Sequence, residues 1–159
     1  MLSVNIICIG AVKEKHFTDA YNEYAKRLTA FCKLTLIEIP EYKLPDNPSF
    51  ANINDGLIKE GRQILSKIPK NSYKIALAVE GKQKSSEEMA ELLKDISNKN
   101  SMVTLIIGGS YGLSDEVKNT CDIRLSFSKM TFPHQLMRVI LAEQLYRAFT
   151  INAGTKYHK

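Results

Sequence analysis

Short apolar runs rich in β-branched residues alternate with amphipathic stretches along the whole chain. Apolar runs bounded by Gly, Pro or charged residues predict buried strands, and they lie at residues 4–9, 34–39, 73–79, 102–107 and 123–125. Apolar residues spaced by three and four predict helices, at 17–31, 54–68 and 85–98, in a short segment after Ser114, and from Pro133 to about Phe149. This alternation favours an open, mostly parallel α/β sheet with helices on both faces.

Composition supports one ordinary domain spanning residues 1–159. Hydrophobic residues make up 44% of the chain and charged residues 25%, which argues against a disordered or coiled-coil protein. No apolar run approaches 18 residues and no basic leader precedes the first strand, so we expect no membrane span and a cytoplasmic location. Three widely spaced cysteines and three dispersed histidines predict neither a disulfide framework nor a metal site.

The distribution of charge is more informative than its sum of +5. Acidic and basic residues balance over residues 1–123. Residues 124–159 carry the whole excess, with Arg124, Lys129, Arg138, Arg147, Lys156 and Lys159 against Glu143 alone. A basic segment suits a phosphate-bearing partner such as RNA. A solvated cationic tail is an equally good interpretation of the charge alone.

Candidate chemistry lies where the predicted strands end. In an open α/β sheet, ligands bind outside the carboxyl ends of the strands. Glu80-Gly81 follows the third strand, Gly108-Gly109 the fourth, and the segment SFSKMTF (126–132) the fifth. The glycine pair lets backbone approach a flat ligand closely, although a tight turn without a ligand is the more ordinary explanation of this pair taken alone. Neither GxGxxG nor GxxxxGK[ST] is present, so the usual nucleotide motifs have no support.

Two further groups of residues suit an anionic or aromatic substrate. His134 and Arg138 share a helix face near its positive N-terminus, where they bind an anion or cap the preceding loop. The terminal Tyr157-His158-Lys159 combines a stacking ring, an imidazole that titrates near neutrality and a cation, unless the tail is simply frayed.

Taken together, these segments resemble one family from end to end. LIIGGSYGLSDEV, LSFSKMTFPHQLMRVILAEQLYRAF and the terminal YHK are similar to the ribosomal RNA large subunit methyltransferase H family, a branch of the SPOUT methyltransferases. The resemblance implies an α/β domain whose C-terminal segment forms a trefoil knot, an exception to unknotted topology. It also implies S-adenosylmethionine as cofactor, held by Leu77, Gly108, Phe127, Ser128, Lys129, Met130, Thr131 and Phe132.

The implied reaction is methylation of N3 of a pseudouridine in helix 69 of 23S rRNA, by a homodimer acting on the assembled 70S ribosome. Transfer to an imide nitrogen needs a base, or a cation that stabilises the imide anion. We therefore expect Arg138 as electrostatic stabiliser and His158 or His134 as base. The residues expected to contact RNA are Arg138, Tyr157, His158 and Lys159.

Two other functions compete with this interpretation. The first is a ribosome-binding or rRNA-binding module of the same fold that lacks catalysis. The second is a phosphate-handling hydrolase that uses the glycine turn as an anion nest, for which the sequence supplies no nucleophile, metal ligands or base.

Overall fold

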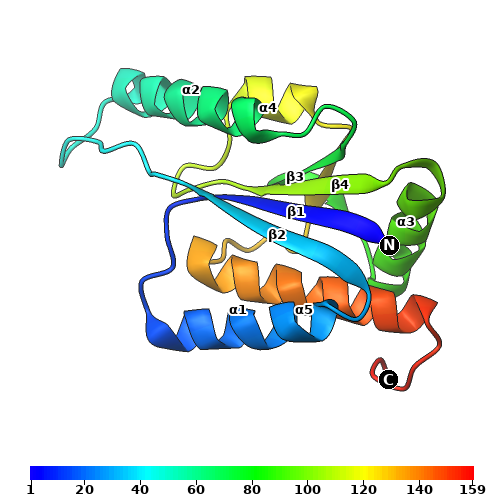
Figure 1. The fold of residues 1–159 in the computed structure, drawn as a ribbon. Helices are drawn as coiled ribbons and strands as arrows, with labels where there is room; N and C mark the ends of the chain where they lie inside the picture. Colours follow the sequence, from blue (N-terminus) through cyan, green and yellow to red (C-terminus); the bar gives the residue numbers. More distant parts are fainter.

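Five parallel strands form the central sheet of the computed structural model, which describes residues 1–159 (Figure 1). The order across the sheet is β2-β1-β4-β3-β5, and every neighbouring pair is parallel. The strands are β1 (Leu2–Ile9), β2 (Cys32–Ile39), β3 (Tyr73–Gln83), β4 (Met102–Ile107) and β5 (Ile123–Ser126). The predicted α/β class with a parallel sheet is therefore confirmed.

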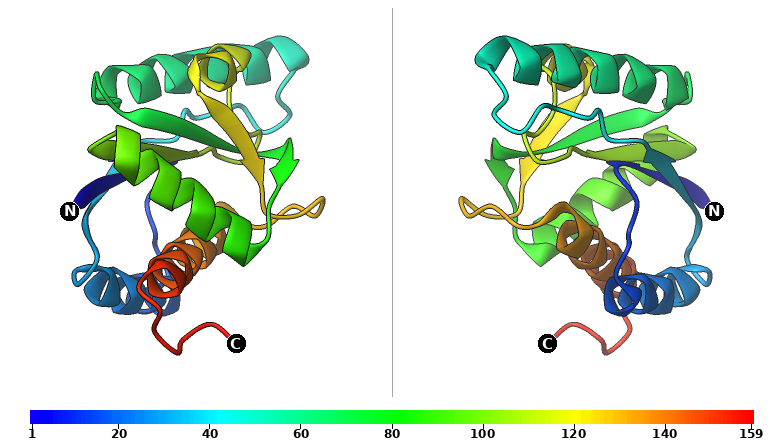
Figure 2. Two further views of the ribbon diagram at one scale, coloured as in Figure 1. Left: turned by 90° about the vertical axis from the view of Figure 1, so that its right-hand side faces the viewer. Right: turned by 90° about the vertical axis from the view of Figure 1, so that its left-hand side faces the viewer.

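Helices cover both faces of the sheet, giving three layers. The helices are α1 (Lys15–Leu28), α2 (Phe50–Lys67), α3 (Ser86–Lys99), α4 (Asp115–Thr120) and α5 (His134–Asn152). Helices α2 and α4 lie on one face, and α1, α3 and α5 lie on the other (Figures 1 and 2). Connections that run in opposite directions along the sheet thus carry their helices on opposite faces, as a constant crossover handedness requires.

A separate apolar core lies under each face. The larger one joins α1, α3 and α5 to the sheet, and the smaller one joins α2 and α4 to it. Strands β1 and β4 contribute to both cores, because alternate residues of a strand point to opposite faces. Ile6 and Leu105 lie in the larger core, and Ile7 and Ile106 in the smaller. Burial on both faces explains why these strands are continuous apolar runs in the sequence.

Two elements differ in extent from the sequence prediction. Helix α2 begins at Phe50, four residues before the predicted start, because Ser49 and Asn52 form a reciprocal capping box. Strand β3 continues to Gln83, and its pairing with β5 shifts register between Leu77 and Lys82. The shift produces an irregular segment at the carboxyl end of β3, beside the place where the chain leaves β4.

The last helix is buried differently from the prediction. Pro133 is its N-cap rather than its first residue, and the helix runs on to Asn152. Sequence periodicity places Leu136, Val139, Ile140, Leu145 and Phe149 on the apolar stripe, but only Leu145 of these is fully buried. The others are half-buried and spread around the helix, so α5 shows apolar surface in more than one direction. No helix in the structure is both long enough and apolar enough to cross a membrane.

Truncation of the central strand tests this architecture. Leu105→Ala removes a fully buried side chain of β4, and we expect it to lower the free energy of unfolding by about 2–5 kcal/mol. Lys94→Ala on the exposed side of α3 is the matched control and should change this free energy by less than about 0.5 kcal/mol. Urea denaturation followed by circular dichroism measures both. Equal effects of the two variants would contradict the assignment of β4 to the core.

Candidate functional site

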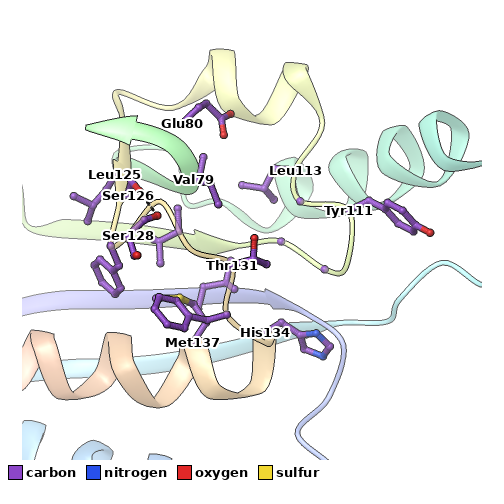
Figure 3. Close-up of a pocket in the computed structure, with 18 of the residues that line it drawn as sticks. Val79, Glu80, Tyr111, Leu113, Leu125, Ser126, Ser128, Thr131, His134 and Met137 are labelled. Carbon is purple, nitrogen blue, oxygen red and sulfur yellow. Dashed lines mark hydrogen bonds between the residues drawn. The ribbon is translucent and has the colours of Figure 1, made fainter. Parts of the chain in front are cut away.

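A cavity of about 370 Å³ opens at the carboxyl ends of β3, β4 and β5 (Figure 3). After β3 the chain goes to α3 on one face of the sheet, and after β4 it goes to α4 on the other. Adjacent strands whose connections diverge in this way form a switch point, the preferred ligand site of an open α/β sheet. The wall consists of residues 77–80, 107–113, Lys118, 125–128, 130–132, His134 and Met137.

One wall of the cavity is the tight turn that follows β4. Gly109 and Gly112 pair across the turn, and the Gly112 N–H donates to the Gly109 carbonyl at 3.1 Å. Gly112 has a φ of +82°, a conformation that side chains disfavour. A Cβ on Gly108 would clash with the carbonyl oxygen of Gly112. The turn therefore depends on glycine at both ends, which leaves backbone groups next to the cavity.

The opposite wall is the loop from Ser126 to Phe132. The Ser126 hydroxyl donates to the Ser128 carbonyl at 2.9 Å, and the Met130 N–H donates to the Ser128 hydroxyl at 3.0 Å. These two bonds fold the loop back on itself. Apolar side chains behind the loop and the turn make the floor of the cavity: Leu77, Ile107, Leu125, Phe127 and Met137. The result is an apolar slot with backbone polar groups at its edges.

Seven of the eight residues expected to hold a cofactor lie around this cavity. They are Leu77, Gly108, Phe127, Ser128, Met130, Thr131 and Phe132. The eighth, Lys129, is exposed and is not part of the wall. Two strand ends and one loop far apart in the sequence thus come together.

Sequence analysis missed a charged pair at the cavity. Glu80 and Lys118 both line it, and their side chains form an ion pair at 2.7 Å. The hydrogen bond from Lys118 holds the pKa of Glu80 below its usual value. The position of Glu80 near the carboxyl end of a predicted strand did indicate a site residue. No such signal marks Lys118, which lies inside α4 and reaches the cavity through the packing of that helix.

His134 stands at the beginning of α5, between this cavity and a second one next to it. Its Nε2 would lie 3.5 Å from a Cβ built on Gly10, so the end of β1 packs against the imidazole. The residue is half-buried. Of the three residues predicted to be catalytic, His134 alone lines the cofactor cavity.

Arg138 is buried, whereas the predicted role of a cation that contacts the substrate requires an accessible side chain. None of its side chain is exposed. The guanidinium donates to the Glu38 carboxylate at 2.6 Å and to the Gly10 carbonyl, while its Nε has no partner. Glu38 also accepts the Val12 N–H at 3.2 Å. Arg138 therefore ties the ends of β1 and β2 to α5, and in this conformation it cannot contact RNA directly.

The C-terminal tail is docked rather than frayed. Tyr157 packs edge-on against Tyr146 with ring centroids 4.7 Å apart, and its hydroxyl donates to Glu143 at 3.1 Å. Burial, a hydrogen bond with Tyr24 and the negative charge of Glu143 raise the pKa of Tyr157 to about 12. His158 lies 2.8 Å from Glu87 and 3.2 Å from Arg147, whereas Lys159 is exposed.

The tail docks away from the cavity of its own chain. Helix α5 begins beside the cavity with His134 and has 19 residues. The chain turns back after the helix (Figure 1), and Tyr157 and His158 dock on Glu143 and Arg147, about 14–20 Å along the helix from His134. The structure therefore does not bring His158 and Tyr157 together with His134 and the cofactor residues within one chain.

Substitution in the glycine turn tests the role of the cavity. Gly108→Ala places a Cβ against the Gly112 carbonyl, so the turn must move. We expect affinity for S-adenosylmethionine to fall at least about tenfold in calorimetry, while the far-ultraviolet circular dichroism spectrum stays that of the wild type. Unchanged affinity would show that the cofactor does not use this wall.

A second substitution tests the structural role of Arg138. Arg138→Met leaves the Gly10 carbonyl without its donor, and we expect a loss of about 1–3 kcal/mol of unfolding free energy. Glu38→Gln is the matched partner variant. Because Glu38→Gln leaves the fully buried Arg138 guanidinium without its counter-charge, it should also cost at least about 1–3 kcal/mol of unfolding free energy. Urea denaturation that finds both variants as stable as the wild type would contradict the role given to Arg138.

Comparison with known proteins assigns the chain to a family. The family model described as "Predicted SPOUT methyltransferase" matches residues 2–158. Proteins named "Ribosomal RNA large subunit methyltransferase H" from Clostridium novyi and Clostridioides difficile are 54% and 50% identical to this chain, over 99% of it and 100% of their own lengths.

Solved structures agree on the fold alone. A probable methylase family protein from Haemophilus influenzae covers 100% of this chain, and 72% of its own, with a TM-score of 0.57 and 17% identity. A tRNA (m1G37) methyltransferase from Aquifex aeolicus covers 91% of this chain and 69% of its own with a TM-score of 0.54 and 12% identity. The full-length matches, together with the cavity at the switch point, show that this chain belongs to the ribosomal RNA large subunit methyltransferase H family of SPOUT methyltransferases.

Proposed function

We propose that this protein transfers a methyl group from S-adenosylmethionine to N3 of a pseudouridine in helix 69 of 23S rRNA on the assembled 70S ribosome. The observation that carries the proposal is the cavity at the switch point, in a chain that matches proteins named as large-subunit rRNA methyltransferases over their full length. A ribosomal substrate places the reaction in the cytoplasm.

The wall of the cavity fits this cofactor. An adenine ring needs an apolar slot flanked by backbone donors and acceptors, and the floor residues and the turn after β4 provide both. Gly108, Gly109 and Gly112 all line the cavity, so backbone atoms border this space at the turn. Glu80 supplies a carboxylate for ribose hydroxyls or for the amino group of the methionine moiety. We therefore assign the adenosine part to the slot between Leu77, Ile107 and the loop 126–132.

The cofactor supplies an electrophilic methyl group on a sulfonium sulfur. The protein would have to align the imide nitrogen with that carbon, exclude water and accept the N3 proton. Alignment alone contributes roughly 7–11 kcal/mol in favourable intramolecular models. His134 and His158 remain the two candidate bases, because an imidazole accepts a proton near neutral pH.

We propose that the active site is shared between two subunits of a homodimer. Within one chain, the tail docks on the middle of α5 at Glu143 and Arg147, about 14–20 Å along the helix from His134 at the cavity. Leu136 and Ile140 on α5 remain half-buried, and Val79 and Met130 beside the cavity are exposed. A second copy packed on this apolar surface would cover it. It would also carry its own Tyr157, His158 and Lys159 toward the cavity of the first.

Two finer features complete the proposal. The C-terminal segment, from β5 through α5, is the part we expect to be threaded as a trefoil knot around the cofactor loop. Dependence on the assembled ribosome follows from size, because a 159-residue chain offers little surface to grip an isolated RNA loop. A catalytically inactive rRNA-binding module is the second candidate function.

Transfer of tritium from labelled S-adenosylmethionine separates the two functions. Wild-type protein should label 23S rRNA in 70S ribosomes isolated from cells that lack it, and should label free 23S rRNA far less. His158→Ala should bind the cofactor normally but transfer slowly in a single turnover. Full single-turnover activity would remove His158 as the base, and cofactor binding without any transfer by the wild type would favour the inactive module.

Mixed dimers test the shared site. Gly108→Ala disables the cavity and His158→Ala disables the tail, so each homodimer should be inactive. A heterodimer of the two contains one intact cavity that faces one intact tail if the site is shared, and should recover about half of the wild-type rate per dimer. If each chain uses its own tail, the purified heterodimer stays inactive.

A further inference from the structure

A second cavity lies at the same edge of the sheet, beyond the turn that follows β4. It measures about 710 Å³ and opens at the carboxyl ends of β1 and β2. Ser110, Tyr111 and His134 line both cavities. In Figure 3, Tyr111 on the turn and His134 at the beginning of α5 lie at one end of the cofactor cavity. The two spaces therefore meet across a thin wall of three side chains.

The lining of the second cavity is polar and aromatic, unlike the apolar slot of the first. Lys13 and Lys43 contribute exposed cations, while Glu41 and Asp46 contribute exposed carboxylates. Because these charges balance, the cavity is not built for a simple anion. Cations suit backbone phosphates, and carboxylates accept hydrogen bonds from the N–H groups of a base.

Two tyrosines add a surface for stacking. Tyr111 is 53% exposed and Tyr42 is 36% exposed, and both belong to this lining. Large exposed aromatic rings beside cations are the usual platform for unpaired bases. The volume lies within the range of small-molecule sites, about 300–1,000 Å³.

Hydrogen bonds hold the wall made by residues 40–46. The Tyr42 N–H donates to the carboxylate of the buried Glu60 at 2.9 Å, and the Tyr42 hydroxyl accepts a bond from Lys59 at 3.2 Å. Ser110 donates to Glu41 at 3.3 Å, which links this wall to the turn after β4. Because this wall is already ordered, ligand binding costs little conformational entropy there.

The facing wall is held by α5 and β2. The Lys13 N–H donates to Gln135 at 3.1 Å, and the Val12 N–H donates to Glu38, which is the partner of the buried Arg138. The bonds made by Arg138 thus position the loop that carries Lys13. Both walls of the second cavity exist before any ligand arrives.

We propose that the second cavity receives the target nucleotide of the RNA substrate, with its base against Tyr111 and its phosphates near Lys13 and Lys43. The inference rests on the proposed RNA methylation and names where that substrate binds. The reacting atoms must come within about 3–3.5 Å of each other, and a base seated at the shared wall faces the cofactor cavity directly. Such a base must first leave its stack, as in other enzymes that modify nucleic-acid bases.

Two sets of variants test this placement in full-length protein with 70S ribosomes as substrate. The double variant Lys13→Ala/Lys43→Ala should raise KM for ribosomes about tenfold and flatten its dependence on salt, because two phosphate contacts are lost. Its calorimetric Kd for S-adenosylmethionine should stay within about twofold of the wild type, since neither lysine lines the cofactor cavity. Lys33→Ala, an exposed lysine near the amino end of β2, is the matched control and should behave as the wild type.

The aromatic platform is tested at Tyr111. Tyr111→Ala should raise KM for ribosomes about tenfold through loss of one stacked base, whereas Tyr111→Phe keeps the ring and should stay close to the wild type. If the wild type methylates ribosomes while Lys13→Ala/Lys43→Ala and Tyr111→Ala match Lys33→Ala, this placement of the nucleotide is wrong and the proposed function stands. If the wild type transfers no methyl group to ribosomes, the placement and the proposed function are both wrong.

Discussion

The close approach of Gly108 to the Gly112 carbonyl is the constraint on which the site depends. It lets the chain turn back at the end of a strand that is buried on both faces, and the turn places Ser110 and Tyr111 between the two cavities. The connection from β4 to β5 runs along the sheet in the opposite direction from that of β3 to β4, so right-handed crossovers place α4 on the opposite face from α3. The turn makes this change of face within a few residues and borders both cavities.

Helix α5 has two roles that conflict in a single chain. Its first turn borders the first cavity with His134, and its middle anchors the docked tail through Glu143, Tyr146 and Arg147. A rigid helix keeps these positions apart, so one subunit holds the cavity wall and the basic tail at different places. The proposed assembly of two copies would remove this separation, and it would cover the apolar residues that spread around α5 instead of forming one stripe.

Features that depend on local sequence could be predicted, and features that depend on long-range packing could not. The bounds of β4 follow from its uninterrupted apolar run, and the start of α3 follows from the Ser85 and Glu88 capping box. The capping box of α2 uses Asn52 in place of the usual Glu or Gln, which explains the late predicted start. The burial of Arg138 arises from the ends of β1 and β2, about a hundred residues away, and no local pattern signals it. The cofactor residues were found through family resemblance, because composition and spacing do not distinguish a ligand loop from a plain turn.

The central claim is that this cavity serves methylation of one ribosomal nucleoside. Mass mapping of helix 69 nucleosides tests it most directly, in cells that lack the protein and in the same cells that express the wild type or Gly108→Ala. The account predicts a pseudouridine without its N3 methyl group in the deletion strain, restored by the wild type but not by Gly108→Ala. A fully methylated helix 69 in the deletion strain would contradict it.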